Sequence, residues 1–125
     1  MIRLAGTTST PSVEYFGDES TLRIVGESYP ENSFQFYAPL FSWLKANLPL
    51  MDQFLLEINI PYMNSSSTKC ILDILDMLAD RVQDGGICSV RWLYEAGNDR
   101  AFELAKEFEE DMDIPFDIVP LELKK

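Results

Sequence analysis

The chain contains no histidine and only two cysteines among its 125 residues. The absence of histidine removes the most common general base, the most common metal ligand and every Ser-His-Asp or Cys-His arrangement. Two cysteines are too few for a disulfide framework or a four-cysteine zinc site. Cys70 and Cys88 stand among apolar residues, so we expect both to be buried as small hydrophobic side chains. The sequence therefore predicts no metal site, no cofactor and no catalytic residue.

Basic residues are also scarce, because ten Lys and Arg stand against 21 Asp and Glu, a formal net charge of −11 at pH 7. An acidic surface repels nucleic-acid phosphates and anionic lipids, so neither nucleic acid nor a membrane surface is expected as the main partner. No apolar run is long enough to span a bilayer, and the N-terminus lacks the pattern of a signal peptide. We therefore expect a cytoplasmic protein without membrane insertion.

Hydrophobic residues make up 46% of the chain, enough for the core of one domain over residues 1–125. Their periodicity predicts the order β-β-α-β-α-β-α-β. The predicted strands are 12–16, 21–27, 53–60, 87–94 and 116–119; the predicted helices end near Asn47, Gly85 and Asp111. Strands that alternate with helices imply right-handed crossovers and a mixed or largely parallel sheet, hence an α/β fold.

The first predicted helix contains a proline, which leaves its start open. Either the helix begins near Ser33 and kinks at Pro39, or its regular part begins near Ala38 with Pro39 in the first turn. Its apolar residues recur at spacings of three and four and predict one buried face, formed by Phe34, Tyr37, Phe41, Leu44 and Leu48.

The most informative segment, residues 61–69, reads Pro-Tyr-Met-Asn-Ser-Ser-Ser-Thr-Lys. It joins the end of a predicted central strand to the start of a helix, where ligand sites gather in α/β sheets and free N–H groups attract anions. Any residue from Asn64 to Thr68 could simply cap the helix. Capping does not need five consecutive amide or hydroxyl side chains, so a structural and a functional role both stay open.

Four functional interpretations of this loop can be compared. No glycine lies between Gly26 and Gly85, which excludes a phosphate-binding P-loop. A serine nucleophile would have only Lys69 as its base, and adjacent residues on a helix do not face each other. The loop has no carboxylate for a metal. The remaining interpretation is a hydroxyl that is itself phosphorylated, because a phosphoryl group in the first helical turn meets the positive end of the helix dipole. Lys69 is close by, and the first acid, Asp73, is a full turn away.

Three sequence blocks stand out: Gly-Glu-Ser-Tyr-Pro-Glu-Asn-Ser at 26–33, Tyr-Met-Asn-Ser-Ser-Ser-Thr-Lys at 62–69 and Arg-Trp-Leu-Tyr at 91–94. Together they resemble the SiaC family of bacterial regulatory phosphoproteins, and the likeness covers nearly the whole chain in the same order. The resemblance implies a single domain similar to the anti-sigma-factor antagonists of the STAS type. It also implies that Thr68 is the phosphorylated residue, in a phosphosite loop that includes Tyr62, Asn64, Ser65, Ser66, Ser67 and Lys69.

The resemblance implies a switch without enzymatic activity of its own. A kinase resembling anti-sigma-factor kinases and a PP2C-type phosphatase would act on Thr68. The unmodified form would bind and activate a diguanylate cyclase, which raises cyclic-di-GMP and promotes aggregation or biofilm. Two alternatives stay open. One is an anti-sigma-factor antagonist in a partner-switching pathway, and the other is a small enzyme that uses the Ser65–Thr68 hydroxyls with Lys69.

Two further groups of residues are candidates for partner binding. Acidic residues recur at helical spacing after Thr68 and form either a solvated face or a docking stripe for a basic partner: Asp73, Asp76, Asp80 and Asp84. In the earlier block, Tyr29, Glu31 and Asn32 exceed what a helix cap needs, and we expect them to close over the Thr68 loop.

Overall fold

The structure, a computed structural model, describes residues 2–122 of the chain. The described residues form a six-stranded sheet, three α-helices and two short 3-10 helices. The strands are β1 (Arg3–Leu4), β2 (Ser12–Phe16), β3 (Thr21–Val25), β4 (Gln53–Asn59), β5 (Ile87–Glu95) and β6 (Phe116–Leu121). The α-helices are α1 (Ser33–Asn47), α2 (Ser65–Gln83) and α3 (Asp99–Glu110), and the 3-10 helices are Gly17–Glu19 and Leu48–Leu50.

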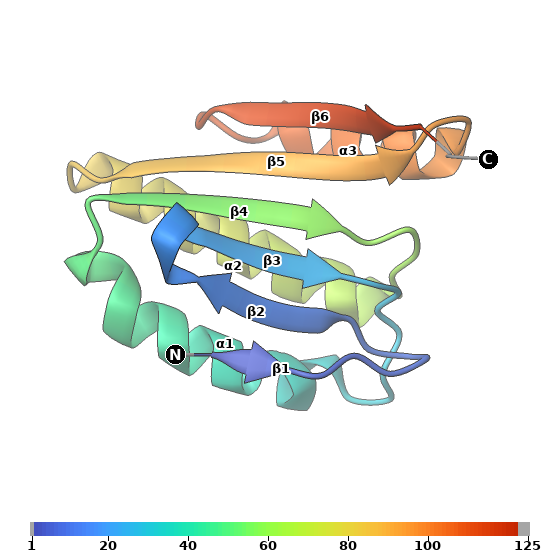
Figure 1. The fold of residues 1–125 in the computed structure, drawn as a ribbon, viewed down its shortest axis with the longest axis horizontal. Coiled ribbons are helices and arrows are strands. Elements are labelled where there is room, and N and C mark those ends of the chain that lie inside the picture. Colours follow the sequence, from blue (N-terminus) through green and yellow to red (C-terminus); the bar gives the residue numbers. More distant parts are fainter. Residues whose placement is uncertain (1, 123–125) are drawn as a thin grey trace.

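Strands that are consecutive in sequence are also neighbours in the sheet, in the order β1-β2-β3-β4-β5-β6. The β1–β2 and β2–β3 pairs are antiparallel, whereas β3–β4, β4–β5 and β5–β6 are parallel. An α-helix connects each parallel pair, and right-handed crossovers that all step in one direction place their helices on one face. Figure 1 shows α1, α2 and α3 together behind the sheet. The predicted mixed α/β sheet is confirmed.

The core lies between the sheet and the three helices. Alternate strand residues point toward the helices and are buried, among them Leu22, Leu56 and Trp92. On α2 the buried apolar face consists of Ile71, Ile74, Leu75 and Leu78. Cys70 and Cys88 are both buried and free, as predicted.

A row of alternating charges crosses the opposite face of the sheet. The strand register places in one line Arg3, Glu14, Arg23, Glu57, Arg91 and Asp117. Glu57 lies near the middle and is only 9% exposed. Its carboxylate accepts hydrogen bonds from Arg23 Nε at 2.9 Å and from Arg91 Nη1 at 3.2 Å. The hydrogen bond to Glu57, and then the one to Glu19, raise the pKa of Arg23. This buried carboxylate therefore ties β3 and β5 to β4 on the side without helices.

Two details of the N-terminal strands lie outside the predicted order of elements. β1 is a strand of only two residues, Arg3–Leu4, which is too short to produce a readable alternation. The connection between β2 and β3 contains a 3-10 helix over Gly17–Glu19. It ends at Ser20, which adopts a left-handed conformation with φ of 51°.

The helix α1 begins at Ser33 and runs through Pro39, so of the two starts left open the earlier one is confirmed and the one near Ala38 is wrong. The Asn32 side chain caps the helix by accepting a hydrogen bond from the Gln35 N–H. This cap offsets part of the cost of the proline, which has no N–H to donate inside a helix. The predicted burial of Phe34 is also wrong, because its ring is 51% exposed while Leu40 is buried.

The buried carboxylate yields a prediction about stability. Glu57→Gln should lower the free energy of unfolding by about 1–3 kcal/mol, because two charge-assisted hydrogen bonds lose their ionised acceptor. Glu14→Gln is the matched control, since its contact with Arg3 is long, at 3.9 Å, and exposed. This control should change stability by less than about 0.5 kcal/mol. Urea denaturation of the variants measures both values, and equal effects would contradict the central role of Glu57.

Candidate functional site

The first two sequence blocks, residues 26–33 and 62–69, lie against each other just beyond the carboxyl ends of β3 and β4. An isolated parallel bridge joins Ser28 to Met63. The Ser28 N–H donates to the Tyr62 carbonyl, and the Asn64 N–H donates to the Ser28 carbonyl, each at 2.9 Å. Strand-like pairing thus continues past the ends of the two strands. It brings the start of α1 and the start of α2 together.

Three buried serine hydroxyls connect these two helix starts. Ser28, Ser33 and Ser67 are each at most 1% exposed. The Ser67 hydroxyl lies 2.8 Å from that of Ser28 and 2.9 Å from that of Ser33. The network continues to the Tyr37 hydroxyl, 2.7 Å from Ser28, and to the Ser66 hydroxyl, 2.8 Å from Ser33. We call these five residues the hydroxyl network.

Each hydroxyl has a single proton, which fixes the direction of the hydrogen bonds. Ser28 donates to Ser67, so Tyr37 must donate to Ser28. Burial raises the pKa of Tyr37 to about 12, so this phenol keeps the proton that it donates. Ser67 accepts from Ser28, so its own proton is available to Ser33, the other hydroxyl within reach at 2.9 Å. The donors then run from Tyr37 through Ser28 to Ser67 and from there to Ser33 at the start of α1.

Asn64 is the N-cap of α2 and also forms a hydrogen bond with the first block, residues 26–33. Its side-chain oxygen accepts a hydrogen bond from the Ser67 N–H at 2.9 Å. Its side-chain nitrogen donates to the Pro30 carbonyl at 3.3 Å. The capping role that the sequence left open is therefore real, and Asn64 alone fills it. The neighbouring hydroxyls have other contacts.

Thr68 lies in the first turn of α2 and is half-buried. Its hydroxyl donates to the Asn64 carbonyl at 3.1 Å. The side chain lines a hollow of about 180 Å³ between α2 and α3, together with Leu72, Leu104, Glu107, Phe108 and Asp111. We call this hollow the α2/α3 groove. Among the neighbouring hydroxyls, Ser67 is fully buried, Ser66 is half-buried and Ser65 is exposed.

The surroundings of Thr68 are more acidic than the sequence indicates. Asp73 is indeed a full turn away along α2, and it pairs with Lys69 at 3.7 Å. However, α3 brings Glu107 and Asp111 into the same hollow as Thr68. Sequence spacing could not show this, because α3 lies far along the chain. A phosphoryl group on Thr68 would face two carboxylates across the groove.

The residues predicted to close over the Thr68 loop are only partly brought there. The Tyr29 and Tyr62 rings meet edge to face, 5.9 Å apart, and both are largely exposed. Asn32 instead caps α1, and Glu31 is exposed. The contacts between the two blocks come mainly from Ser28 and Ser33, which the sequence analysis did not single out. Their only sequence signal was their place in the first block.

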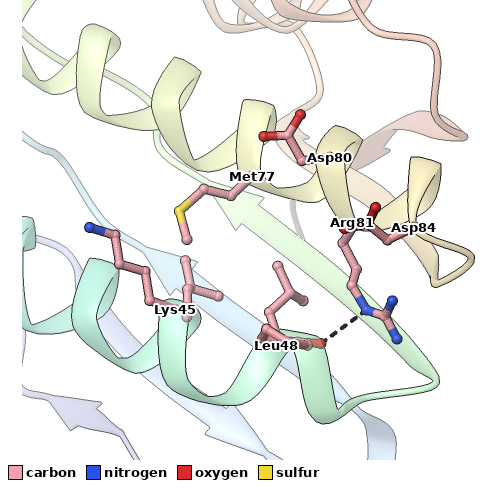
Figure 2. Close-up of a pocket in the computed structure, with 8 residues that line it drawn as sticks. Lys45, Leu48, Met77, Asp80, Arg81 and Asp84 are labelled. Atoms are coloured by element: carbon pink, nitrogen blue, oxygen red, sulfur yellow. Dashed lines mark hydrogen bonds between the residues drawn. The ribbon is translucent and has the colours of Figure 1, made fainter.

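The predicted acidic stripe of α2 divides between two environments. Asp76 is exposed on the outer face of the helix. Asp80 and Asp84 line a second hollow of about 280 Å³, between the last turns of α1 and α2 (Figure 2). Arg81 extends across the end of α1 in this view, and its guanidinium donates to the Leu48 and Met51 carbonyls at 3.2 and 2.9 Å. Arg81 therefore caps the end of α1, which is a structural role.

Residues 2–122 contain neither a metal-binding cluster nor a helix that could span a membrane. Within this range the structure contains no group of three or more His, Cys, Asp or Glu side chains placed to hold a metal ion. No helix formed by these residues is long and apolar enough to cross a membrane.

The fold and the hydroxyl-rich start of α2 can now be compared with known proteins. Residues 4–121 match the family described as SiaC family regulatory phosphoprotein, which places the chain in the class of regulatory phosphoproteins. The chain belongs to the SiaC family. A curated relative, an uncharacterised protein of Pseudomonas aeruginosa strain UCBPP-PA14, is 38% identical over 118 residues, 94% of each chain.

Two solved structures of Pseudomonas aeruginosa SiaC have the same fold. One is SiaC in a crystal structure with the diguanylate cyclase SiaD, where SiaC is described as the activator of SiaD. This SiaC is 36% identical to the present chain, with a TM-score of 0.91, and the match covers 97% of this chain and all of that chain. Apo-SiaC is 35% identical with a TM-score of 0.87, covering 94% of this chain and 97% of that chain. The family resemblance noted in the sequence is confirmed.

The hydroxyl network predicts that removing a single hydroxyl group lowers the stability of the fold. Ser67→Ala leaves the Ser28 proton without its acceptor and the Ser33 hydroxyl without its donor, both in buried positions. We expect the free energy of unfolding to fall by about 1–3 kcal/mol. Ser65→Ala, in the exposed position two residues earlier, should change it by less than about 0.5 kcal/mol. Thermal unfolding of the two variants provides the comparison, and a neutral Ser67→Ala would rule out the network as a stabilising element.

Proposed function

We propose that this protein is a non-enzymatic phospho-switch that acts on a diguanylate cyclase. The unmodified form binds and activates the cyclase, raising cyclic-di-GMP in the cytoplasm and promoting aggregation or biofilm. A kinase resembling anti-sigma-factor kinases phosphorylates Thr68, and a PP2C-type phosphatase removes the phosphoryl group. The single observation that carries the proposal is the close likeness to SiaC in its complex with the cyclase SiaD, at a TM-score of 0.91 over 97% of this chain.

The choice of Thr68 has support from the local geometry. Ser67 is buried in the hydroxyl network, so a kinase cannot reach its oxygen without unfolding the helix start. Thr68 lines an open hollow, and its hydroxyl makes one hydrogen bond, to the Asn64 carbonyl. The same carbonyl also accepts the Thr68 N–H at 2.9 Å, so it keeps a hydrogen bond when the hydroxyl turns away. The hydroxyl can therefore turn outward without leaving a buried group unsatisfied.

The enzymatic alternative has less support. A Ser-Lys mechanism needs the lysine amine close to a serine hydroxyl. Lys69 is exposed and its amine pairs with Asp73, one turn further along α2. The Ser67 hydroxyl already donates to Ser33 and accepts from Ser28. The other alternative, an anti-sigma-factor antagonist, shares the switch and differs only in the effector.

The sign of the switch follows from the charge of a phosphoryl group. Phosphorylation adds about −1.5 to −2 charges at pH 7. At the start of α2 this charge meets the positive end of the helix dipole, so the fold itself should tolerate it. An effector surface that accepts a neutral hydroxyl would instead have to bury a strongly hydrated anion. That burial costs several kcal/mol without a cationic partner, which corresponds to a loss of about two orders of magnitude in affinity.

This proposal predicts a clear separation of binding from stability. Thr68→Ala should still activate the cyclase and should no longer respond to the kinase. Thr68→Asp should lose activation at an unchanged melting temperature. Activation is measured as cyclic-di-GMP made from GTP by a purified cyclase, which affinity capture from the host with Thr68→Ala as bait should supply. Activation by Thr68→Asp equal to that of the unmodified protein would contradict the sign.

Intact-mass spectrometry of the protein from its native host separates switch from enzyme. The switch predicts a fraction with one phosphate adduct that maps to Thr68 and disappears on treatment with a PP2C-type phosphatase. The enzyme predicts no phosphate and a hydroxyl that reacts with acylating probes. Acylation at Ser65 or Ser66 without phosphate at Thr68 would overturn the proposal.

A further inference from the structure

The α2/α3 groove has an apolar floor that the packing of the domain leaves uncovered. Leu72 of α2 is 39% exposed although its neighbours Ile71 and Ile74 are fully buried. Leu104 and Phe108 of α3 form the rest of the floor. Beneath them the Phe108 ring stacks on the buried Trp92 ring, with centroids 4.9 Å apart, so this side of the groove is rigid.

The size of the groove decides what class of ligand it accepts. Its volume of about 180 Å³ is below the range of about 300–1,000 Å³ that small-molecule and cofactor pockets occupy. Its rim carries Glu107 and Asp111, which would repel the phosphates of a nucleotide. The groove therefore suits one or two apolar side chains from a protein partner and does not suit a nucleotide.

The charged residues that line the groove are both acidic. Glu107 and Asp111 line it, and Glu103 lies one turn before Glu107 on the same face of α3. Nearby basic residues offset these acids only in part: Arg100 lies one turn before Leu104 on α3, Lys69 pairs with Asp73 and Lys106 pairs with Glu109. An apolar floor with an acidic rim is complementary to a helix that has an apolar face flanked by Lys and Arg.

We propose that the α2/α3 groove is the docking site for a basic amphipathic helix of the effector, which inserts an apolar side chain between Leu72 and Phe108. This inference rests on the proposed function, because it assigns the surface through which the switch acts. Two helices that lie side by side on one face of a sheet leave a channel into which a third helix packs at about 8–10 Å. Apolar anchors spaced by three or four residues along the partner helix would follow this channel.

The groove also accounts for how one phosphoryl group controls binding. Thr68 lies inside the groove, so its phosphoryl group would occupy the space that the apolar anchor needs. It would also sit opposite Glu107 and Asp111, and none of the described residues that line the groove is basic. The anchor would then lose its apolar contact and meet a hydrated anion. Occlusion of the groove, rather than a change of fold, is therefore the mechanism of release.

The test compares groove variants with matched variants near the amino ends of β3 and β4. Leu72→Gln removes an apolar contact, and its control is Leu50→Gln, since Leu50 is 81% exposed and lies in the segment before β4. Glu107→Lys reverses a rim charge, and its control is Asp18→Lys, with the same change in net charge at an exposed position before β3. The probe is the purified cyclase captured with Thr68→Ala, titrated with each unphosphorylated variant.

We expect Leu72→Gln to weaken binding by about tenfold or more, as for an anchor contact. Glu107→Lys should weaken it by about tenfold and flatten its dependence on salt. Both controls should bind within about twofold of wild type, and all four variants should keep the wild-type melting temperature.

Two different failures can be told apart. If the unmodified protein neither captures nor activates a cyclase, the proposed function fails and the docking surface fails with it. If it activates the cyclase and Thr68→Asp does not, yet the two groove variants bind like their controls, the switch stands and the α2/α3 groove is not the docking site.

Discussion

The position of Thr68 depends on the hydrogen bonds of one buried hydroxyl, that of Ser67. This hydroxyl accepts from Ser28 and donates to Ser33, and so joins the segment after β3 to the first turn of α2. Because the network is buried, any rotation of the helix start would leave hydroxyl groups without partners, at a cost of about 1–3 kcal/mol each. Thr68 follows directly on the helix and inherits this rigidity. In the proposed switch, a phosphoryl group on this fixed surface would change binding without changing the fold.

The two faces of the sheet have separate tasks in this arrangement. The face with the helices contains the core and carries both the hydroxyl network and the α2/α3 groove. The other face has no helix over it among residues 2–122 and is crossed by the charge row centred on Glu57. Because all three crossovers place their helices on one side, the starts of α1 and α2 come close at one edge of the sheet (Figure 1).

The sequence predicts the fold well where the signal is local. The apolar periodicity of α2, the buried strand β4 and the order of alternating elements are all present in the structure. The segment from Asn64 to Lys69 is also readable, because its polar residues are contiguous, although it forms the cap and first turn of α2 rather than a loop. Contacts between distant segments leave no such pattern. The partnership of Ser67 with Ser28 and Ser33, and the placement of Glu107 opposite Thr68, arise only once β3, β4 and α3 are arranged in space.

The central claim is that phosphorylation of Thr68 blocks effector binding while the fold persists. The most direct measurement is a calorimetric titration of the purified cyclase with unmodified protein and with protein phosphorylated at Thr68, alongside the melting temperature of each form. The account predicts binding weaker by about two orders of magnitude for the phosphorylated form, at the same melting temperature. Equal or tighter binding by the phosphorylated form would contradict it.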